Sequence, residues 1–209
     1  TSALMNTNRR RIFQFLCRHP CSSLKDISSS LGLSRPTVKW HMEVLVEAEY
    51  LDYLQHGKKS IYCPAGLLSR RAMGVFSVLS NPAGRAMYWS LVNNPGQDRS
   101  GISSNVSASP GQVSKLLGFL QESGLVSSVR DGKHVRYYPT EEYIDIIDQE
   151  TASQKQFVKR FIKKMKSEHL NPRTSEMKGG IVTIEITVPG QTVKIQVPNH
   201  PFEELFKDV

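Results

Sequence analysis

The stretch SRPTVKWHMEVL, residues 34–45, decides the fold that this sequence predicts. Ser34 is a good N-cap, because its hydroxyl can accept a hydrogen bond from an unpaired amide in the first turn of a helix. Val38, Met42 and Leu45 follow at spacings of four and three residues, which places them on one face of that helix. The stretch therefore predicts a helix with one buried apolar face, and its remaining positions are open to a partner.

Helices are predicted before this stretch and a hairpin after it. An amphipathic helix around residues 12–16 is followed by a short helix over residues 24–31, with Gly32 at the turn. After the stretch, residues 50–54 and 61–63 predict two strands joined by a turn at residues 56–57. The first 64 residues thus predict three helices and a hairpin.

The same pattern occurs a second time. A shift of 75 residues aligns residues 10–64 with residues 85–139 without a gap, and 14 of the 55 pairs are identical. Ser34, Val38 and Leu45 align with Ser109, Val113 and Leu120. In the second copy the turn is Asp131-Gly132, a strong hairpin signal. We call residues 10–64 the first copy and residues 85–139 the second copy.

Three helices followed by a hairpin form the winged helix-turn-helix pattern. Residues 34–45 with residues 47–51, and residues 109–120 with residues 122–126, resemble the recognition helix and wing of ArsR/MarR-like transcriptional regulators, and the tandem arrangement resembles archaeal two-winged regulators. The resemblance implies an α+β, mainly helical fold and a regulator that binds double-stranded DNA in a sequence-specific way through two winged domains per chain. Glu49 departs from the family pattern, which usually has a helix-ending glycine there, as Gly124 is in the second copy.

Four segments follow from these patterns. Residues 1–80 are expected to form the first winged domain with a connecting helix, and residues 81–139 the second winged domain. Residues 140–170 predict one long helix, which serves either for homodimerisation or for packing against its own second domain. Residues 171–209 predict a loop to residue 180, a β-hairpin, and a short helix capped by Asn199.

The candidate DNA contacts are the exposed positions of the third helices and the cations of the wings, because the N-terminal turns of such a helix face base edges. Gln112 is the best candidate for reading an adenine. These residues are Arg35, Thr37, Lys39, Trp40, Lys58, Lys59, Gln112, Ser114, Lys115, Arg130, Lys133 and Arg136. The alternative is that these positions are solvated surface on a winged helix that contacts proteins of the transcription machinery.

The distribution of charge favours DNA as the partner. The chain carries a formal net charge of +8, of which residues 1–80 contribute +6 and residues 81–139 contribute +3. Residues 140–170 are balanced and residues 171–209 carry −1. Arg9–Arg11 is either a further candidate for phosphates or a solvated charge run. The basic half of the long helix, residues 155–166, is a candidate for DNA flanks or for an anionic membrane surface.

Other chemistry finds little support. Cys17, Cys21 and Cys63 raise the alternative of a metal-sensing or redox-sensing regulator, but their spacing is not that of a zinc site. His41 aligns with Leu116 at the edge of the buried face, so it is expected to pack rather than to bind a ligand. The sequence has no catalytic motif, so we expect neither an enzyme nor a cofactor. It also has no apolar run long enough for a membrane span, and we expect a cytoplasmic protein.

Overall fold

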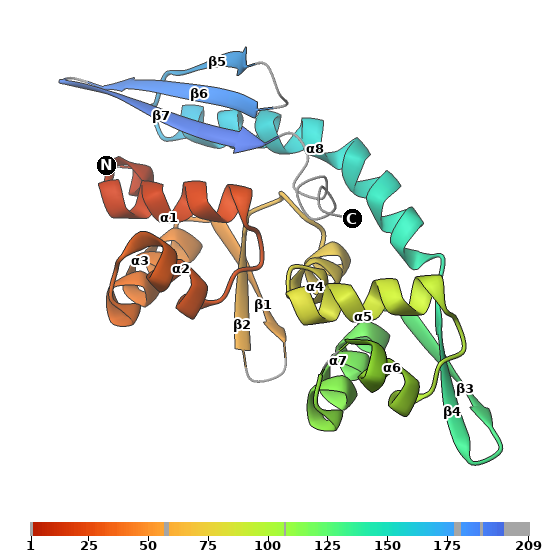
Figure 1. Cartoon of the computed structure of the whole chain (residues 1–209). Coiled ribbons are helices and arrows are strands. Elements are labelled where there is room, and N and C mark those ends of the chain that lie inside the picture. Colours follow the sequence, from red (N-terminus) through yellow and green to blue (C-terminus); the bar gives the residue numbers. More distant parts are fainter. Residues whose placement is uncertain (1, 57–58, 107, 178–180, 189, 199–209) are drawn as a thin grey trace. The chain divides into compact units, whose positions relative to one another are not determined.

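The computed structural model describes residues 2–56, 59–106, 108–177, 181–188 and 190–198 (Figure 1). The chain divides into two compact units. Unit 1 comprises Thr1–Ser69 together with Gln149–Val209, and unit 2 comprises Arg70–Asp148. Unit 1 is therefore assembled from two separate segments of the chain, with unit 2 inserted between them.

The first copy lies in unit 1. Its elements are η1 (Ala3–Met5), α1 (Thr7–Arg18), α2 (Leu24–Leu31), α3 (Arg35–Glu47), β1 (Leu51–His56) and β2 (Lys59–Pro64). Ser34 caps α3 through a hydrogen bond from the Thr37 amide, and Gly32 takes a positive φ of 65° at the turn before it. The two strands pair antiparallel, with Leu51 opposite Pro64. The predicted helix cap, turn and hairpin are therefore all present.

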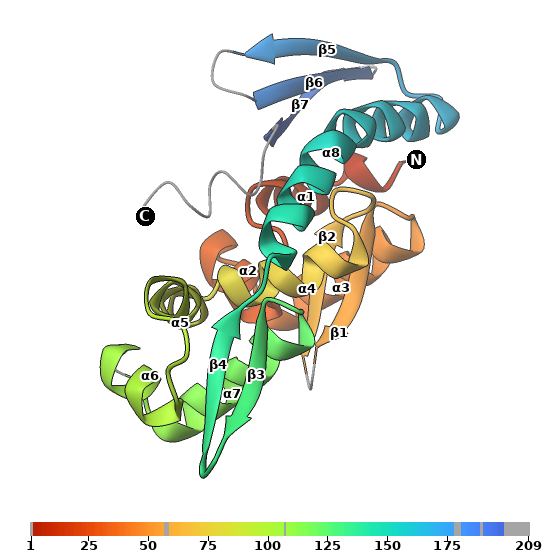
Figure 2. The same ribbon diagram turned by 90° about the vertical axis from the view of Figure 1, so that its right-hand side faces the viewer.

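The second copy lies in unit 2 and has the same order of elements. These are α5 (Pro82–Asn93), α6 (Arg99–Val106), α7 (Pro110–Glu122), β3 (Val126–Asp131) and β4 (His134–Pro139), preceded by α4 (Arg70–Leu79). Ser109 caps α7 as Ser34 caps α3. The strands β3 and β4 pair antiparallel, with Val126 opposite Pro139, and form the hairpin labelled in Figure 2.

The third helix of each copy ends in the same backbone conformation. Glu49 has a φ of 56° and Gly124 has a φ of 79°, so both are left-handed. Glycine adopts this conformation without steric cost, whereas a side chain crowds the following carbonyl oxygen. The departure of Glu49 from the family pattern thus changes the strain at this position and not the path of the chain.

A single helix, α8 (Glu142–Ser167), occupies the predicted long-helix segment. In unit 1 its residues Phe157, Phe161 and Met165 are buried, and the Phe161 ring stacks on the Phe13 ring of α1 with centroids 5.0 Å apart. The face on which dimerisation was predicted is therefore used inside the chain along this half. Packing within the chain was the alternative, and it holds at both ends of the helix: Tyr143 lies against the second copy, as expected, with its ring centroid 5.7 Å from that of Tyr88, whereas Phe157, Phe161 and Met165 pack within unit 1. The side chain of Ile147 lies outside the described residues.

The C-terminal segment forms a three-stranded antiparallel sheet with the order β5-β6-β7. Its strands are β5 (Pro172–Met177), β6 (Ile181–Val188) and β7 (Gln191–Pro198). The prediction of a loop over residues 171–180 is wrong for β5, which pairs with β6 through a register that places Thr174 opposite Ile184. The residues of β5 are mostly polar, so the sequence shows no alternating apolar pattern there. The strand forms because its backbone pairs with β6. The helix predicted after Asn199 lies outside the described residues.

The sheet packs on the first copy. Ile184, Ile186 and Ile195 are fully buried, and β7 lies against α1 (Figure 1). The Gln14 amide of α1 donates a hydrogen bond to the Lys194 carbonyl of β7 at 3.4 Å. None of the described helices combines the length and the apolar character needed to cross a membrane.

Candidate nucleic-acid interface

Helix α3 presents a polar face opposite its buried one. Val38, Met42 and Leu45 are fully buried in unit 1, as their spacing predicts. Arg35, Lys39 and Trp40 are exposed, and the Trp40 side chain retains 55% of its accessible surface. Thr37 is half-buried, and its hydroxyl lies 2.7 Å from the Ser34 hydroxyl at the helix cap. Three of the four residues predicted for DNA contact on this helix are thus free to reach a partner.

Glu43 and His41 lie beside two of the exposed residues of this face, Lys39 and Trp40. The Lys39 ammonium lies 3.8 Å from the Glu43 carboxylate, but both side chains are more than half exposed, and such a pair is weak. The ring of Trp40 lies 4.7 Å from the ring of His41. His41 itself is only 4% exposed, and burial, with a smaller contribution from Arg9, lowers its pKa. His41 is therefore a packed residue, as the repeat alignment predicts.

The first wing carries an aromatic pair that was not predicted from the sequence. Tyr53 of β1 is 54% exposed, and its ring centroid lies 6.2 Å from that of Tyr62, its cross-strand partner. The signal was present in the hairpin pairing, because directly opposed residues lie on the same face. Lys58 lies outside the described residues, as does the side chain of Lys59, so their predicted contacts stay predictions.

Helix α7 uses one of its candidate residues for its own cap. Gln112, Ser114 and Lys115 are exposed, as predicted. However, the Gln112 side-chain carbonyl accepts hydrogen bonds from the amide and the hydroxyl of Ser109, at 3.2 and 3.1 Å. Bidentate recognition of adenine needs both the carbonyl and the amide of a glutamine. Gln112 can read adenine in that way only after it leaves the capping box.

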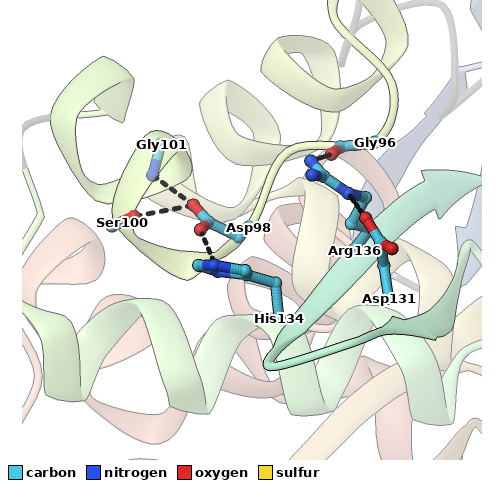
Figure 3. Close-up of polar contacts among 7 residues, drawn as sticks. All are labelled: Gly96, Asp98, Ser100, Gly101, Asp131, His134 and Arg136. Atoms are coloured by element: carbon cyan, nitrogen blue, oxygen red, sulfur yellow. Dashed lines mark hydrogen bonds and ion pairs between the residues drawn. The ribbon is translucent and has the colours of Figure 1, made fainter.

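The second wing is held by polar contacts to the chain before α6 (Figure 3). Arg136 donates from Nε to Asp131 at 2.6 Å and from Nη1 to the Gly96 carbonyl at 3.0 Å. His134 Nδ1 lies 3.1 Å from a carboxylate oxygen of Asp98. Arg130 and Lys133 are exposed, whereas Arg136 is partly buried and paired. Of the predicted cations on this wing, two are therefore open to a partner.

These contacts lower the pKa values of both carboxyl groups. Hydrogen bonds from the Gly101 amide and the Ser100 hydroxyl lower the pKa of Asp98 to about 2, and His134 adds a smaller contribution. The hydrogen bond and charge of Arg136 lower the pKa of Asp131. Both groups are therefore anionic at neutral pH. Their negative charge offsets part of the positive charge of the second wing.

The arginine run at the start of α1 is also engaged in structure. Arg9 donates to the Ala3 carbonyl at 2.6 Å, Arg10 to the Met5 carbonyl at 2.7 Å, and Arg11 to the Leu31 carbonyl at 2.8 Å. Carbonyls at the end of a helix lack partners within it, so these contacts satisfy η1 and α2. The three arginines contribute positive charge to unit 1, and their guanidinium groups are hydrogen-bonded to backbone carbonyls.

The charge of the chain is concentrated in unit 1. Unit 1 contains 19 basic and 12 acidic residues, a net charge of +7, whereas unit 2 contains 8 and 7, a net charge of +1. Counted by sequence segment, residues 140–170 are neutral. The division into units separates the acidic start of α8, in unit 2, from its basic half, in unit 1. The two copies themselves carry the same net charge, +3 over residues 10–64 and +3 over residues 85–139, so the difference between the units comes from the segments around the copies.

The cysteines lie in the core of unit 1. Cys17, Cys21 and Cys63 are buried free thiols, and burial raises the pKa values of Cys17 and Cys63. Metal binding and thiol chemistry both need the thiolate, which a raised pKa makes scarce. Among the described residues no group of three His, Cys, Asp or Glu side chains could hold a metal ion. Packing accounts for these cysteines better than sensing does.

Comparison with known proteins defines the class of the first copy. Residues 5–52 match the family model for winged helix-turn-helix DNA-binding domains, and this match confirms the resemblance that residues 34–51 carry. The chain thus contains a winged helix-turn-helix domain of the DNA-binding class.

A curated relative and two solved structures show similarity to longer parts of the chain. An uncharacterised HTH-type transcriptional regulator of Methanocaldococcus jannaschii is 26% identical over 138 residues, which cover 66% of this chain and 34% of the relative. The chain therefore spans about a third of the length of that relative. An ArsR-like transcriptional regulator from a Rhodococcus species is 20% identical, with a TM-score of 0.37, over 47% of this chain and 89% of its own. A transcriptional regulator from Thermotoga maritima is 12% identical, with a TM-score of 0.32, over 65% of this chain and 87% of its own.

Proposed function

We propose that this protein is a transcriptional regulator that binds double-stranded DNA with helix α3 in the major groove. The observation that carries the proposal is the face of Arg35, Lys39 and Trp40, displayed on an N-capped helix in the unit that holds +7 of the net charge. The domain class and the curated relative support the same function.

Each side chain on this face has a distinct use at DNA. Arg35 lies at the start of α3, where a guanidinium group can pair with a guanine edge or with a phosphate. Lys39 lies one turn further on and suits a phosphate. The exposed ring of Trp40 suits apolar contact with a thymine methyl group. The first wing, with Lys58, Lys59 and the exposed Tyr53, would then follow the adjacent backbone.

The second copy is, in our proposal, a second winged domain that lies in the unit of lower net charge. Unit 2 carries a net charge of only +1, and Arg136 is already paired. Ser114 and Lys115 on α7 and Arg130 and Lys133 on the wing remain as candidate contacts. The protein would bind one DNA with both copies or pair as a homodimer, and light scattering of the free protein distinguishes monomer from dimer.

The proposal is tested by removing charge in two places. The double variant R35A/K39A removes one arginine and one lysine from α3, and R173A/K194A removes the same pair of residue types from the exposed surface of β5 and β7. Fluorescence anisotropy with labelled genomic duplexes gives the affinity between 50 and 200 mM salt. R35A/K39A should bind roughly tenfold or more weakly, and its log–log salt slope should be shallower by about 0.9 for each phosphate that the variant no longer neutralises. An equal weakening in the two variants, or no duplex affinity in the unmodified protein, would contradict the proposal.

A protein-contact role for the second copy is the alternative function. Val129 and Val135 of the second wing are 56% and 40% exposed, and they lie on opposite faces of the hairpin. In that case V129S/V135S would abolish co-purification with a transcription protein while R35A/K39A left it intact. Under the DNA proposal, V129S/V135S binds duplex DNA as tightly as the unmodified protein does in the absence of any other protein.

A further inference from the structure

In each copy a contact at its base attaches the wing to the rest of the domain. In both, a backbone hydrogen bond joins the loop after the first helix to the second wing strand. Cys21 donates to the Tyr62 carbonyl at 2.9 Å in the first copy, and Gly96 donates to the Tyr137 carbonyl at 2.8 Å in the second. These contacts lie at the base of the wing, so the tip needs other contacts to be held.

The second copy adds a carboxylate that touches two elements at once. One oxygen of Asp98 accepts hydrogen bonds from the Gly101 amide at 2.9 Å and the Ser100 hydroxyl at 2.7 Å, at the beginning of α6. The other oxygen lies 3.1 Å from Nδ1 of His134, the first residue of β4 (Figure 3). In the first copy the aligned residues are Ser23 and Lys59, and Ser23 caps α2 through the Asp26 amide. The helix cap is common to both copies, and in the second copy the capping residue Asp98 also contacts the wing.

We propose that Asp98 is a positioning residue that fixes the second wing relative to helices α6 and α7, so that the wing and α7 engage DNA together. The inference rests on the proposed DNA binding and names a residue that does not itself contact DNA. A two-stranded hairpin alone is only marginally stable in water. A contact near its tip therefore removes freedom that binding would otherwise have to remove.

The charge of Asp98 makes positioning distinguishable from simple electrostatics. A carboxylate on a DNA-binding surface repels phosphates, so its removal by itself should strengthen binding. Asp98 and Asp131 both interact electrostatically with His134, and Asp131 is paired with Arg136. Removal of Asp98 thus leaves His134 without its carboxylate partner. Positioning and electrostatics predict opposite signs for the effect on affinity.

Two variants with the same charge change separate these effects. Asp98→Ser keeps the cap that Ser23 provides in the first copy and gives up the hydrogen bond to the wing. Asp98→Asn also removes the charge, but it keeps an oxygen for the helix end and an amide that can form a hydrogen bond with Nδ1 of His134. At pH 7.5 we expect D98S to bind duplex DNA about 3- to 10-fold more weakly than D98N, with similar Tm values. Equal affinities of D98S and D98N would overturn the proposal, whether or not both variants bind more tightly than the unmodified protein.

Hydrogen exchange of the free protein gives a readout that needs no DNA. The amides of β3 and β4 near the tip, including those of Val135 and Arg136, should exchange several-fold faster in D98S than in D98N, while the amides of α6 exchange alike. Failure of DNA binding in the unmodified protein would refute the proposed function and leave this difference intact. Identical exchange of the wing in the two variants would show that Asp98 is a helix cap only.

Discussion

Replacement of Phe161 by alanine tests whether the long helix is an integral part of the first winged domain. The Phe161 side chain is 5% exposed, and its ring stacks on Phe13 at 5.0 Å and on Phe157 at 5.9 Å. It also meets Tyr50 edge-on at 6.0 Å. The ring thus joins α8 to the helix α1 and to the start of the first wing.

The expected destabilisation is large compared with the stability of a domain. Truncation of a buried phenylalanine costs about 3–5 kcal/mol, against a typical total of roughly 5–15 kcal/mol. With a urea dependence near 2 kcal/mol per molar, the unfolding midpoint of unit 1 should fall by about 2 M. Phe161→Leu keeps most of the volume and should cost less than about 1.5 kcal/mol.

Urea unfolding followed by far-UV circular dichroism measures this shift. Trp89 belongs to unit 2, so its fluorescence in a Trp40→Phe background reports that unit separately and should change little. Lys163→Ala, on an exposed position of the same helix, serves as the control and should stay within about 0.5 kcal/mol. A midpoint shift below about 0.5 M for Phe161→Ala would refute the idea that α8 completes the core of unit 1.

Three further outcomes follow from single positions. Glu49→Gly should stabilise unit 1 by about 0.5–1 kcal/mol in urea unfolding, because it relieves a left-handed backbone and gives up only the ion pair of a side chain that is 85% exposed. The pKa of Asp98 is lowered to about 2 in the folded state, so the stability that its carboxylate contributes is present above the unfolded pKa and is lost as the pH falls from about 4 to 2. In an acid titration, the stability of unit 2 should therefore decline less steeply in D98N than in the unmodified protein. Gly84→Ala should lower the Tm of unit 2, because an added Cβ would collide with the Val78 carbonyl oxygen.

Local signals with a fixed spacing were readable from the sequence. The two copies, the caps at Ser34 and Ser109, and the buried faces of α3 and α7 all follow from short-range rules about hydrogen bonds and helical periodicity. The engagement of Gln112 was also readable, because Ser109 followed by Gln112 is the capping-box spacing. Its exposed position on the third helix favoured a contact with DNA instead.

Features that depend on distant partners were not readable. Strand β5 owes its order to pairing with β6, and Arg9 and Arg10 bind carbonyls whose positions depend on the fold of η1. The hydrogen bond between Asp98 and His134 joins residues 36 positions apart, and neither residue type alone indicates the other. The burial of Phe157 and Phe161 requires the first copy to be in place. The net charge of unit 1 was not readable either. A count by sequence segment treats residues 1–69 and residues 149–209 separately, although they form one unit.

The insertion of unit 2 into unit 1 has a consequence for synthesis on the ribosome. Phe13 and Tyr50 are made early, but Phe157 and Phe161, which pack against this aromatic cluster, are more than 90 residues downstream. At about 5–20 residues per second, the interval is roughly 5 to 20 s. Throughout that time the nascent first domain lacks part of its core, while the whole of unit 2 is being made. The inserted unit is therefore available to fold first, and the domain nearest the N-terminus is completed last.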